Sequence, residues 1–130
     1  MSVVIRCDAG GADGLGHAAR MLSVACELVA RKQDVVFLTR TKQFVDWYLT
    51  QGVSDGISAR YVSRTISEWD MIIGEVKHDG DVKTIVIDRK GDYDAAMFRE
   101  LRERVKVIRV DHPEASEGTA DLLVIPNMQQ

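Results

Sequence analysis

The sequence predicts an α/β fold with a doubly wound parallel sheet, because short β-rich runs alternate with longer helical patterns along the chain. The chain has 130 residues, which is a common size for one domain. Its composition, with 45% hydrophobic and 28% charged residues, is that of a globular protein. We therefore expect residues 1–130 to form a single Rossmann-like domain of three layers.

The first half of the chain contains two strand–helix pairs. Residues 3–7 are a β-branched run that stops at Asp8 and a glycine-rich segment. Apolar residues then recur at helical spacing over about 17–31. Residues 34–38 are predicted to form the second strand, and the aromatic and apolar residues of 44–49 indicate a second helix.

The second half continues the alternation. We expect a third strand over 57–62 and a helix over 65–76, with apolar residues on one face. Residues 84–87 predict a buried strand, and residues 93–105 carry apolar side chains at four-residue intervals, as in a helix. The last two strands are expected over 107–110 and 122–125.

Polar residues follow the predicted strands, where a doubly wound sheet binds its ligands. They are Asp8 with the glycine-rich segment, Arg40, Asp88 with Arg89, Asp111 with His112, and Asn127.

Charge and composition argue against several partners and locations. The formal net charge of -3 gives no basic surface for nucleic acid, and no apolar run is long enough for a membrane span. Cys7 and Cys26 each fall in an apolar run, without metal-ligand spacing, so we expect buried free thiols. The start of the chain lacks the pattern of a signal peptide, and we expect a cytoplasmic protein.

The glycine-rich segment after the first strand predicts an anion site. Glycine permits close approach of a ligand to the backbone, and the following helix offers unpaired N–H groups and a positive dipole end. The fingerprint GxGxxG is absent, and the second strand ends in Thr39-Arg40 rather than in an acidic residue. Both features argue against nicotinamide or flavin binding. The phosphate-binding Gly-Lys-Ser/Thr pattern is also absent.

His17 is the candidate catalytic residue. It lies at the predicted helix start, where the positive dipole end favours the neutral imidazole that a general base needs. The alternative is a structural role as a helix cap.

Three segments resemble a known family: Ile5-Arg6-Cys7-Asp8-Ala9, Gly14-Leu15-Gly16-His17 with the helix after it, and Val35-Val36-Phe37-Leu38-Thr39-Arg40. The chain resembles the N-terminal domain of the UDP-2,4-diacetamido-2,4,6-trideoxy-β-L-altropyranose hydrolases of pseudaminic acid biosynthesis. It is similar in the same way to their relatives in spore-coat polysaccharide biosynthesis. These are proteins of GT-B fold, and the resemblance extends more weakly over the later strands.

The resemblance implies a sugar-nucleotide hydrolase or a related glycosyltransferase. His17 would position or deprotonate the water that attacks a UDP-sugar, and the substrate would meet Asp8, Gly14, Gly16, Arg20 and Asp88. It implies no cofactor and no metal. Because a GT-B enzyme uses a second Rossmann-like domain for the nucleotide, it also implies a second domain or chain as partner.

This sequence departs from the family pattern at three places. Gly10 replaces a serine, Met21 replaces a cysteine, and the tyrosine that should follow Asp88 closely is delayed to Tyr93. These changes leave the sugar open. The chain is either a fragment, a half-enzyme that pairs with another chain, or a descendant with a different role.

A non-catalytic role is the alternative, in which the domain is a binding or assembly module whose loop holds an anion without chemistry. The aspartates at the strand ends have a structural alternative too, since Asp88 and Asp111 at such positions often cap the next turn. No pair of histidines has zinc spacing, so no metal site is expected.

Overall fold

The computed structural model describes residues 1–9, 16–52, 55–88, 95–110 and 122–124 of the chain. In chain order, the strands are β1 (Ser2–Cys7), β2 (Asp34–Thr39), β3 (Ile57–Tyr61), β4 (Val82–Asp88), β5 (Lys106–Val110) and β6 (Leu122–Val124). The helices are α1 (Gly16–Ala30), α2 (Lys42–Leu49), α3 (Glu68–His78) and α4 (Ala95–Arg102).

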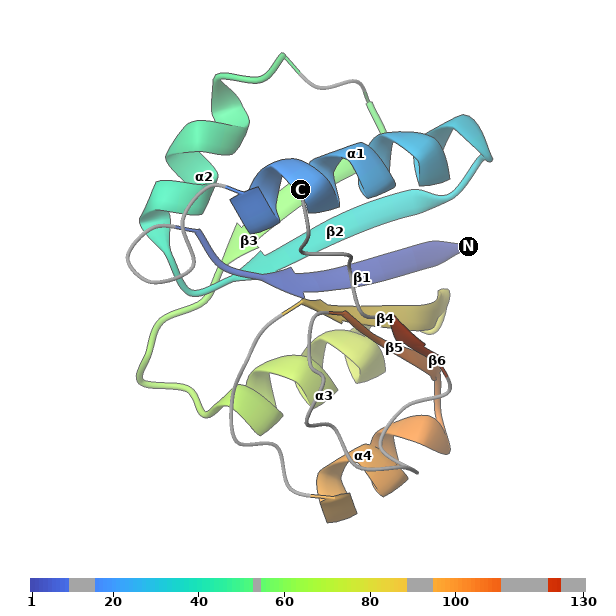
Figure 1. Cartoon of the computed structure of the whole chain (residues 1–130). Helices are drawn as coiled ribbons and strands as arrows, with labels where there is room; N and C mark the ends of the chain where they lie inside the picture. The colour runs from blue at the N-terminus through green and yellow to red at the C-terminus, as the bar shows by residue number, and fades with distance from the viewer. Residues whose placement is uncertain (10–15, 53–54, 89–94, 111–121, 125–130) are drawn as a thin grey trace.

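The six strands form one parallel sheet in the order β3-β2-β1-β4-β5-β6. The helices α1 and α2 lie on one face, and α3 and α4 lie on the other (Figure 1). The chain reverses its direction of winding between β1 and β4, so these two neighbours mark the topological switch point of the sheet. The predicted Rossmann-like, doubly wound fold is confirmed.

Two apolar layers hold the helices to the sheet. On the α1 side, Ile5, Phe37 and Phe44 are fully buried, and the rings of Phe37 and Phe44 lie 5.0 Å apart at 53°. On the α3 side, Val4, Ile85 and Leu101 are buried between the sheet and the helices. Successive side chains of a strand point to opposite faces, which is why the strands read as nearly continuous apolar runs.

Local chemistry sets the element ends that the sequence left approximate. The third helix begins at Glu68 rather than near residue 65, because the hydroxyl of Ser67 accepts a hydrogen bond from the N–H of Asp70 and caps the first turn. The fourth helix ends at Arg102, three residues early, because the N–H groups of Glu103 and Arg104 bond only three residues back. The start predicted for this helix, at residues 93–94, lies outside the described residues.

We expect Phe44→Ala to lower the free energy of unfolding by about 3–5 kcal/mol, because it removes a fully buried ring from the α1 side. Leu49→Ala on the same helix is the matched control, since Leu49 is 72% exposed, and its effect should be about 0.5 kcal/mol or less. Urea denaturation of both variants measures the two changes. Equal losses would contradict the packing described here.

Candidate functional site

A buried ion cluster lies at the carboxyl ends of β1 and β2. The guanidinium of Arg6 has none of its side-chain surface exposed, and carboxylates meet it on two sides. It donates to Asp8 at 2.7 and 3.1 Å and to Glu68 at 2.7 and 3.0 Å. Because both contacts use two donors, the cluster fixes three side chains relative to one another.

The carboxylate of Asp8 also joins β1 to the end of β2. Its Oδ1 accepts from the hydroxyl of Thr39 at 3.0 Å and from the N–H of Arg40 at 2.9 Å. Burial alone raises the pKa of Asp8, but the hydrogen bonds and charge of Arg6, with those two donors, outweigh it and hold the pKa below its ordinary value of 3.8. Asp8 is therefore a buried carboxylate held in its ionised form.

Arg40 continues the cluster toward the next helix. Its Nε donates to Glu68 at 3.3 Å, its Nη1 donates to the carbonyl of Ser63 at 3.2 Å, and its Nη2 donates to the carbonyl of Ile66. The hydroxyl of Thr41 accepts a hydrogen bond from the N–H of Ala9 at 3.0 Å. The chain is thus anchored on both strands just before it enters the glycine-rich segment.

An ion pair spans the switch point of the sheet. Arg20 of α1 donates from Nη2 to the two carboxylate oxygens of Asp88, at 3.1 and 3.3 Å. The side chain of Asp88 is fully buried at the end of β4, whereas about a third of the Arg20 side chain is exposed. The pair therefore ties the first turns of α1 to the carboxyl end of β4.

The start of α1 lies beside this pair. Gly16 is the first residue of the helix, and among the residues that the structure describes a Cβ added there would meet no atom within 4 Å outside its chain neighbours and the backbone of its own helix. No acidic residue lies in the first turn, so its positive dipole end is not offset by a carboxylate of that turn. His17 is the second residue of this helix, and its catalytic role stays a prediction because its side chain is outside the described part of the structure.

A cationic residue lies near the carboxyl ends of β2 and β3. Lys42 is exposed as the first residue of α2, and its ammonium lies 5.6 Å from the ring centre of Tyr61 at the end of β3. Thr41, which precedes the helix, makes no side-chain capping bond to it. The edge therefore presents a second helix start with a positive charge next to an aromatic ring.

The structure brings together some predicted site residues and not others. Arg20 and Asp88 are 68 positions apart in the sequence and form an ion pair. Asp8 is bonded to Arg6 and to Thr39 at the end of β2. The binding roles predicted for Asp8, Arg20, Asp88 and Gly16 remain predictions. Gly14, Arg89, Asp111, His112 and Asn127 lie outside the described residues.

Sequence reasoning missed Arg6 and Glu68. Arg6 offered a signal, because a charged residue inside a β-branched run needs a buried partner. Glu68 offered none, because its position on an amphipathic helix is ordinary for a glutamate.

In the part of the chain that the structure describes, no helix has the length and apolar character needed to cross a bilayer.

Comparison with known proteins relates the chain to solved structures alone. No family model and no curated protein matches it. Gre2 from Candida albicans aligns with a TM-score of 0.52 and 14% identity, over 85% of this chain and 36% of that one. Yeast methylglyoxal/isovaleraldehyde reductase Gre2 complexed with NADPH aligns with a TM-score of 0.52 and 16% identity, over the same shares. At this identity the likeness shows the fold, and the chain spans about a third of the length of these proteins.

This comparison corrects the function inferred from the resemblance. Both structures carry the name Gre2, one of them is described as a reductase complexed with NADPH, and neither is a GT-B glycosyltransferase or a sugar-nucleotide hydrolase. The predictions of membership in the pseudaminic acid hydrolase family, of a role in polysaccharide biosynthesis and of a UDP-sugar substrate are therefore wrong. The second Rossmann-like domain was expected from the same resemblance to GT-B enzymes, so that resemblance no longer supports it. A strand, a glycine-rich turn and a helix recur across nucleotide-binding folds, so these motifs did not distinguish among them.

We expect Asp8→Asn to cost about 3 kcal/mol of unfolding free energy at pH 7, because Arg6 would keep only Glu68 as a buried carboxylate partner. The depressed pKa means that the ionised Asp8 contributes its full stabilisation above pH 3.8 and loses it as the pH falls through the lower, folded-state pKa. The difference between wild type and variant should thus stay constant from pH 7 to about pH 4 and shrink below.

Urea denaturation at a series of pH values measures this difference. Asp46→Asn, which changes an exposed carboxylate on α2, serves as control and should cost about 0.5 kcal/mol or less at every pH. A gap that persists unchanged at the lowest pH would show that the ionisation of Asp8 is not its source.

Proposed function

We propose that this chain binds a phosphorylated dinucleotide, NADP(H), and forms the nucleotide-binding part of an oxidoreductase. The observation that carries the proposal is the strand order β3-β2-β1-β4-β5-β6, with a glycine-rich connection from β1 to α1 directly at the switch point. Dinucleotides bind at this position in sheets of this order, with the diphosphate at the helix start.

The start of α1 fits a diphosphate. A bound phosphate oxygen needs backbone N–H groups without a side chain in the way, and no atom of the described residues beyond the helix itself lies within 4 Å of the position that a Cβ of Gly16 would take. Gly10 and Gly14 precede it in the same segment. Gly11 is the fourth glycine of the segment, and although the spacing differs from GxGxxG, four glycines supply the same freedom of backbone approach.

The end of β2 favours the phosphorylated form of the cofactor. An acidic residue there would hydrogen-bond the ribose hydroxyl of NAD, whereas NADP needs positive charge for its 2′-phosphate. The strand ends at Thr39, Arg40 follows it directly, and Lys42 comes next at the start of α2. The guanidinium of Arg40 is already bonded to Glu68 and two carbonyls, so we assign the phosphate contact to Lys42. The lack of an acidic residue at the end of β2 therefore argues against binding of NAD but not against binding of NADP.

The solved structures that share the fold support this choice, since one of them is a reductase complexed with NADPH. When bound, NADP(H) supplies or accepts a hydride. In this chain, Arg20 and Asp88 would hold the first turns of α1 against β4 beside the diphosphate. His17, at the same helix start, is our candidate for proton transfer at a ring nitrogen. We further propose a cytoplasmic location, because Cys26 is an exposed free thiol, and not the buried one expected from the sequence.

We expect Gly16→Ala to weaken NADPH binding at least about tenfold while the thermal melt stays unchanged or rises, because the added methyl is clear of the described residues outside the helix but occupies the proposed phosphate position. Gly74→Ala in α3 is the matched control, since it also adds a methyl to open space on a helix but away from the site. NADPH fluorescence titration of the three proteins measures the affinities. A wild type that binds no NADPH, or a Gly16→Ala variant that binds as wild type does, would refute the proposal.

We expect Lys42→Gln to weaken NADPH binding about threefold to tenfold and to leave NADH binding unchanged, because only NADPH carries the 2′-phosphate. Lys83→Gln, which removes an exposed lysine near the amino end of β4, away from the proposed site, should change neither affinity. Parallel calorimetric titrations with both cofactors give the comparison. Equal losses of affinity for NADPH and NADH would contradict the assignment of the 2′-phosphate contact to Lys42.

A further inference from the structure

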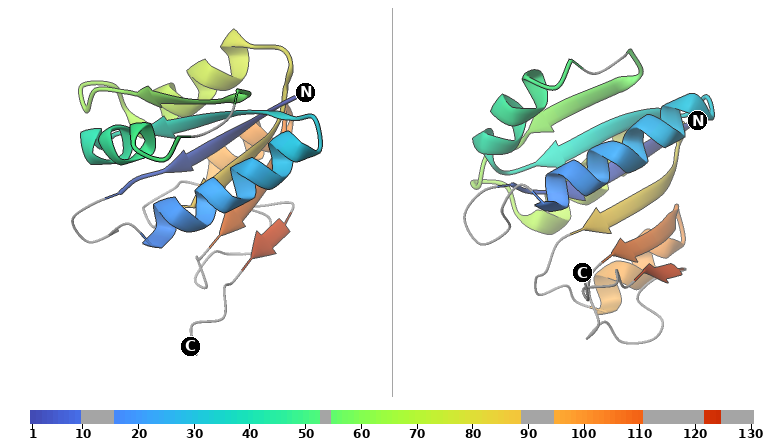
Figure 2. Two further views of the ribbon diagram at one scale, coloured as in Figure 1. Left: turned by 90° about the horizontal axis from the view of Figure 1, so that it is seen from above. Right: turned by 45° about the horizontal axis from the view of Figure 1, so that its top comes forward.

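On the α1 side, the described helices cover only one half of the sheet. The helices α1 and α2 cover the β1, β2 and β3 half of this face, and no described helix lies over β4, β5 and β6 there (Figure 2). A groove of about 590 Å³ runs between α1 and these strands. We call it the β4–β5 groove, and its apolar lining includes Val3, Met21, Val24, Leu28, Val86 and Ile108.

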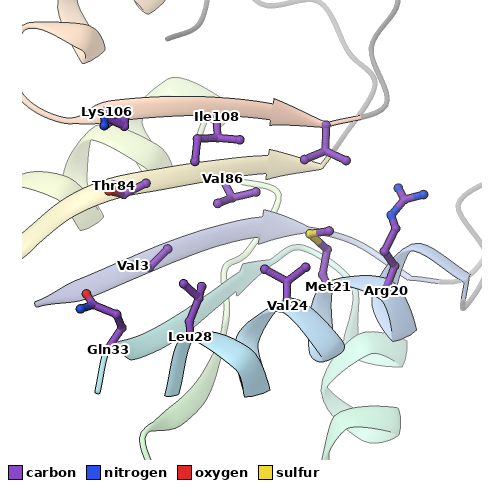
Figure 3. Close-up of a pocket in the computed structure, with 11 residues that line it drawn as sticks. Val3, Arg20, Met21, Val24, Leu28, Gln33, Thr84, Val86, Lys106 and Ile108 are labelled. Carbon is purple, nitrogen blue, oxygen red and sulfur yellow. The ribbon is translucent and has the colours of Figure 1, made fainter. Parts of the chain in front are cut away.

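The side chains in the groove project from the helix and the sheet toward each other. Figure 3 shows Val24 and Leu28 of α1 facing Val3 and Val86 of the sheet, with Ile108 beyond. Val24, on the side of α1 that faces the sheet, is 36% exposed, and Ile108 of β5 is only half-buried. This much exposure is unusual for apolar side chains between a helix and a sheet. Parallel sheets occur almost entirely with both faces covered, so this face has the character of a contact surface.

The charged residues at the groove define the chemistry of its occupant. Arg20 lies toward the carboxyl end of β4, and Lys106 is exposed at the amino end of β5. These two are the charged side chains that line the groove in the described part of the chain, and both are cations. Because Arg20 is already paired with Asp88, Lys106 is the charge that a partner can match, and a partner with a carboxylate beside an apolar face is complementary to it.

A second copy of the same surface fits less well. In a two-fold contact the same patch faces itself, so among the described lining residues a second copy brings no carboxylate to Lys106, only another Lys106 and the paired Arg20. Like charges brought together in this way oppose association. The charge pattern therefore favours an acidic partner over self-association.

The dimensions favour a helix. The four residue steps from Lys106 to Val110 span roughly 13 Å along the strand. A helix of about nine residues covers this length, and one packed beside α1 covers the open face of the sheet. An added strand would need a free sheet edge, whereas the groove lies over the face.

We propose that the β4–β5 groove is the docking site for an amphipathic helix of a partner protein, with Asp or Glu residues flanking its apolar face. Arg20 belongs both to this groove and to the ion pair with Asp88, so the docked helix would lie next to the edge where the nucleotide is proposed to bind. The proposal does not depend on the identity of that nucleotide.

The test is selection of binders from a displayed library of 16-residue helical peptides, followed by affinity measurements with the purified peptides. We expect the enriched peptides to carry apolar residues at i, i+3 or i+4, and i+7, with Asp or Glu beside them. Val24→Glu should weaken their binding at least about tenfold. Ser23→Glu, which adds the same charge to the exposed neighbouring position of α1, should change it less than about twofold.

A charge swap provides the second arm. Lys106→Glu should weaken binding of the acidic peptides at least about threefold, and Lys in place of their flanking Glu should restore binding to this variant. Thermal melts confirm that each variant is folded. The proposal is overturned if no peptide binds, if Val24→Glu has no effect, or if acidic and neutral peptides bind equally. Self-association of the wild type that Val24→Glu abolishes would assign the groove to a second copy and overturn it as well.

Discussion

The arrangement of the site depends on one buried cation, Arg6. A guanidinium with no exposed surface is strongly unfavourable unless carboxylates and hydrogen bonds replace its water. Asp8 and Glu68 do so, and they come from the end of β1 and the start of α3. Asp8 and Glu68 then bind Arg40 of the β2–α2 connection. One charge thus fixes the relative positions of two strand ends and a helix start.

The elements were predictable because burial imposes periodicity, but the site was not, because its contacts are distant in sequence. The apolar runs of β2 and β4 and the pattern of α1 defined these elements. The start of α3 was missed by about three residues, because the bond from Asp70 N–H to Ser67 decides it. Arg6 and Glu68 are 62 positions apart, and nothing in the local pattern pairs them. For Arg20 and Asp88, the sequence indicated only that both lie near the carboxyl ends of the strands, and it did not indicate that they form an ion pair.

The family resemblance failed for a related reason. It depended on Asp8, on the glycines before His17 and on the end of β2, which are the parts that a strand, turn and helix at a switch point require in many nucleotide-binding proteins. Asp8 illustrates the point, since its carboxylate is bonded within the protein to Arg6, Thr39 and the N–H of Arg40. A residue can therefore match a motif because the fold needs it there, and such a match carries little information about the substrate.

Arg20 connects the two surfaces proposed here, and its position has a thermodynamic consequence. Its guanidinium lines the β4–β5 groove and at the same time holds Asp88, at the end of β4. A helix that placed a carboxylate near Arg20 would compete with Asp88 for the same donors. The strength of the tie between α1 and β4 would then differ between the free and the occupied groove. Because coupling between two binding sites is reciprocal, nucleotide at the start of α1 would alter helix docking by the same factor by which the helix alters nucleotide affinity.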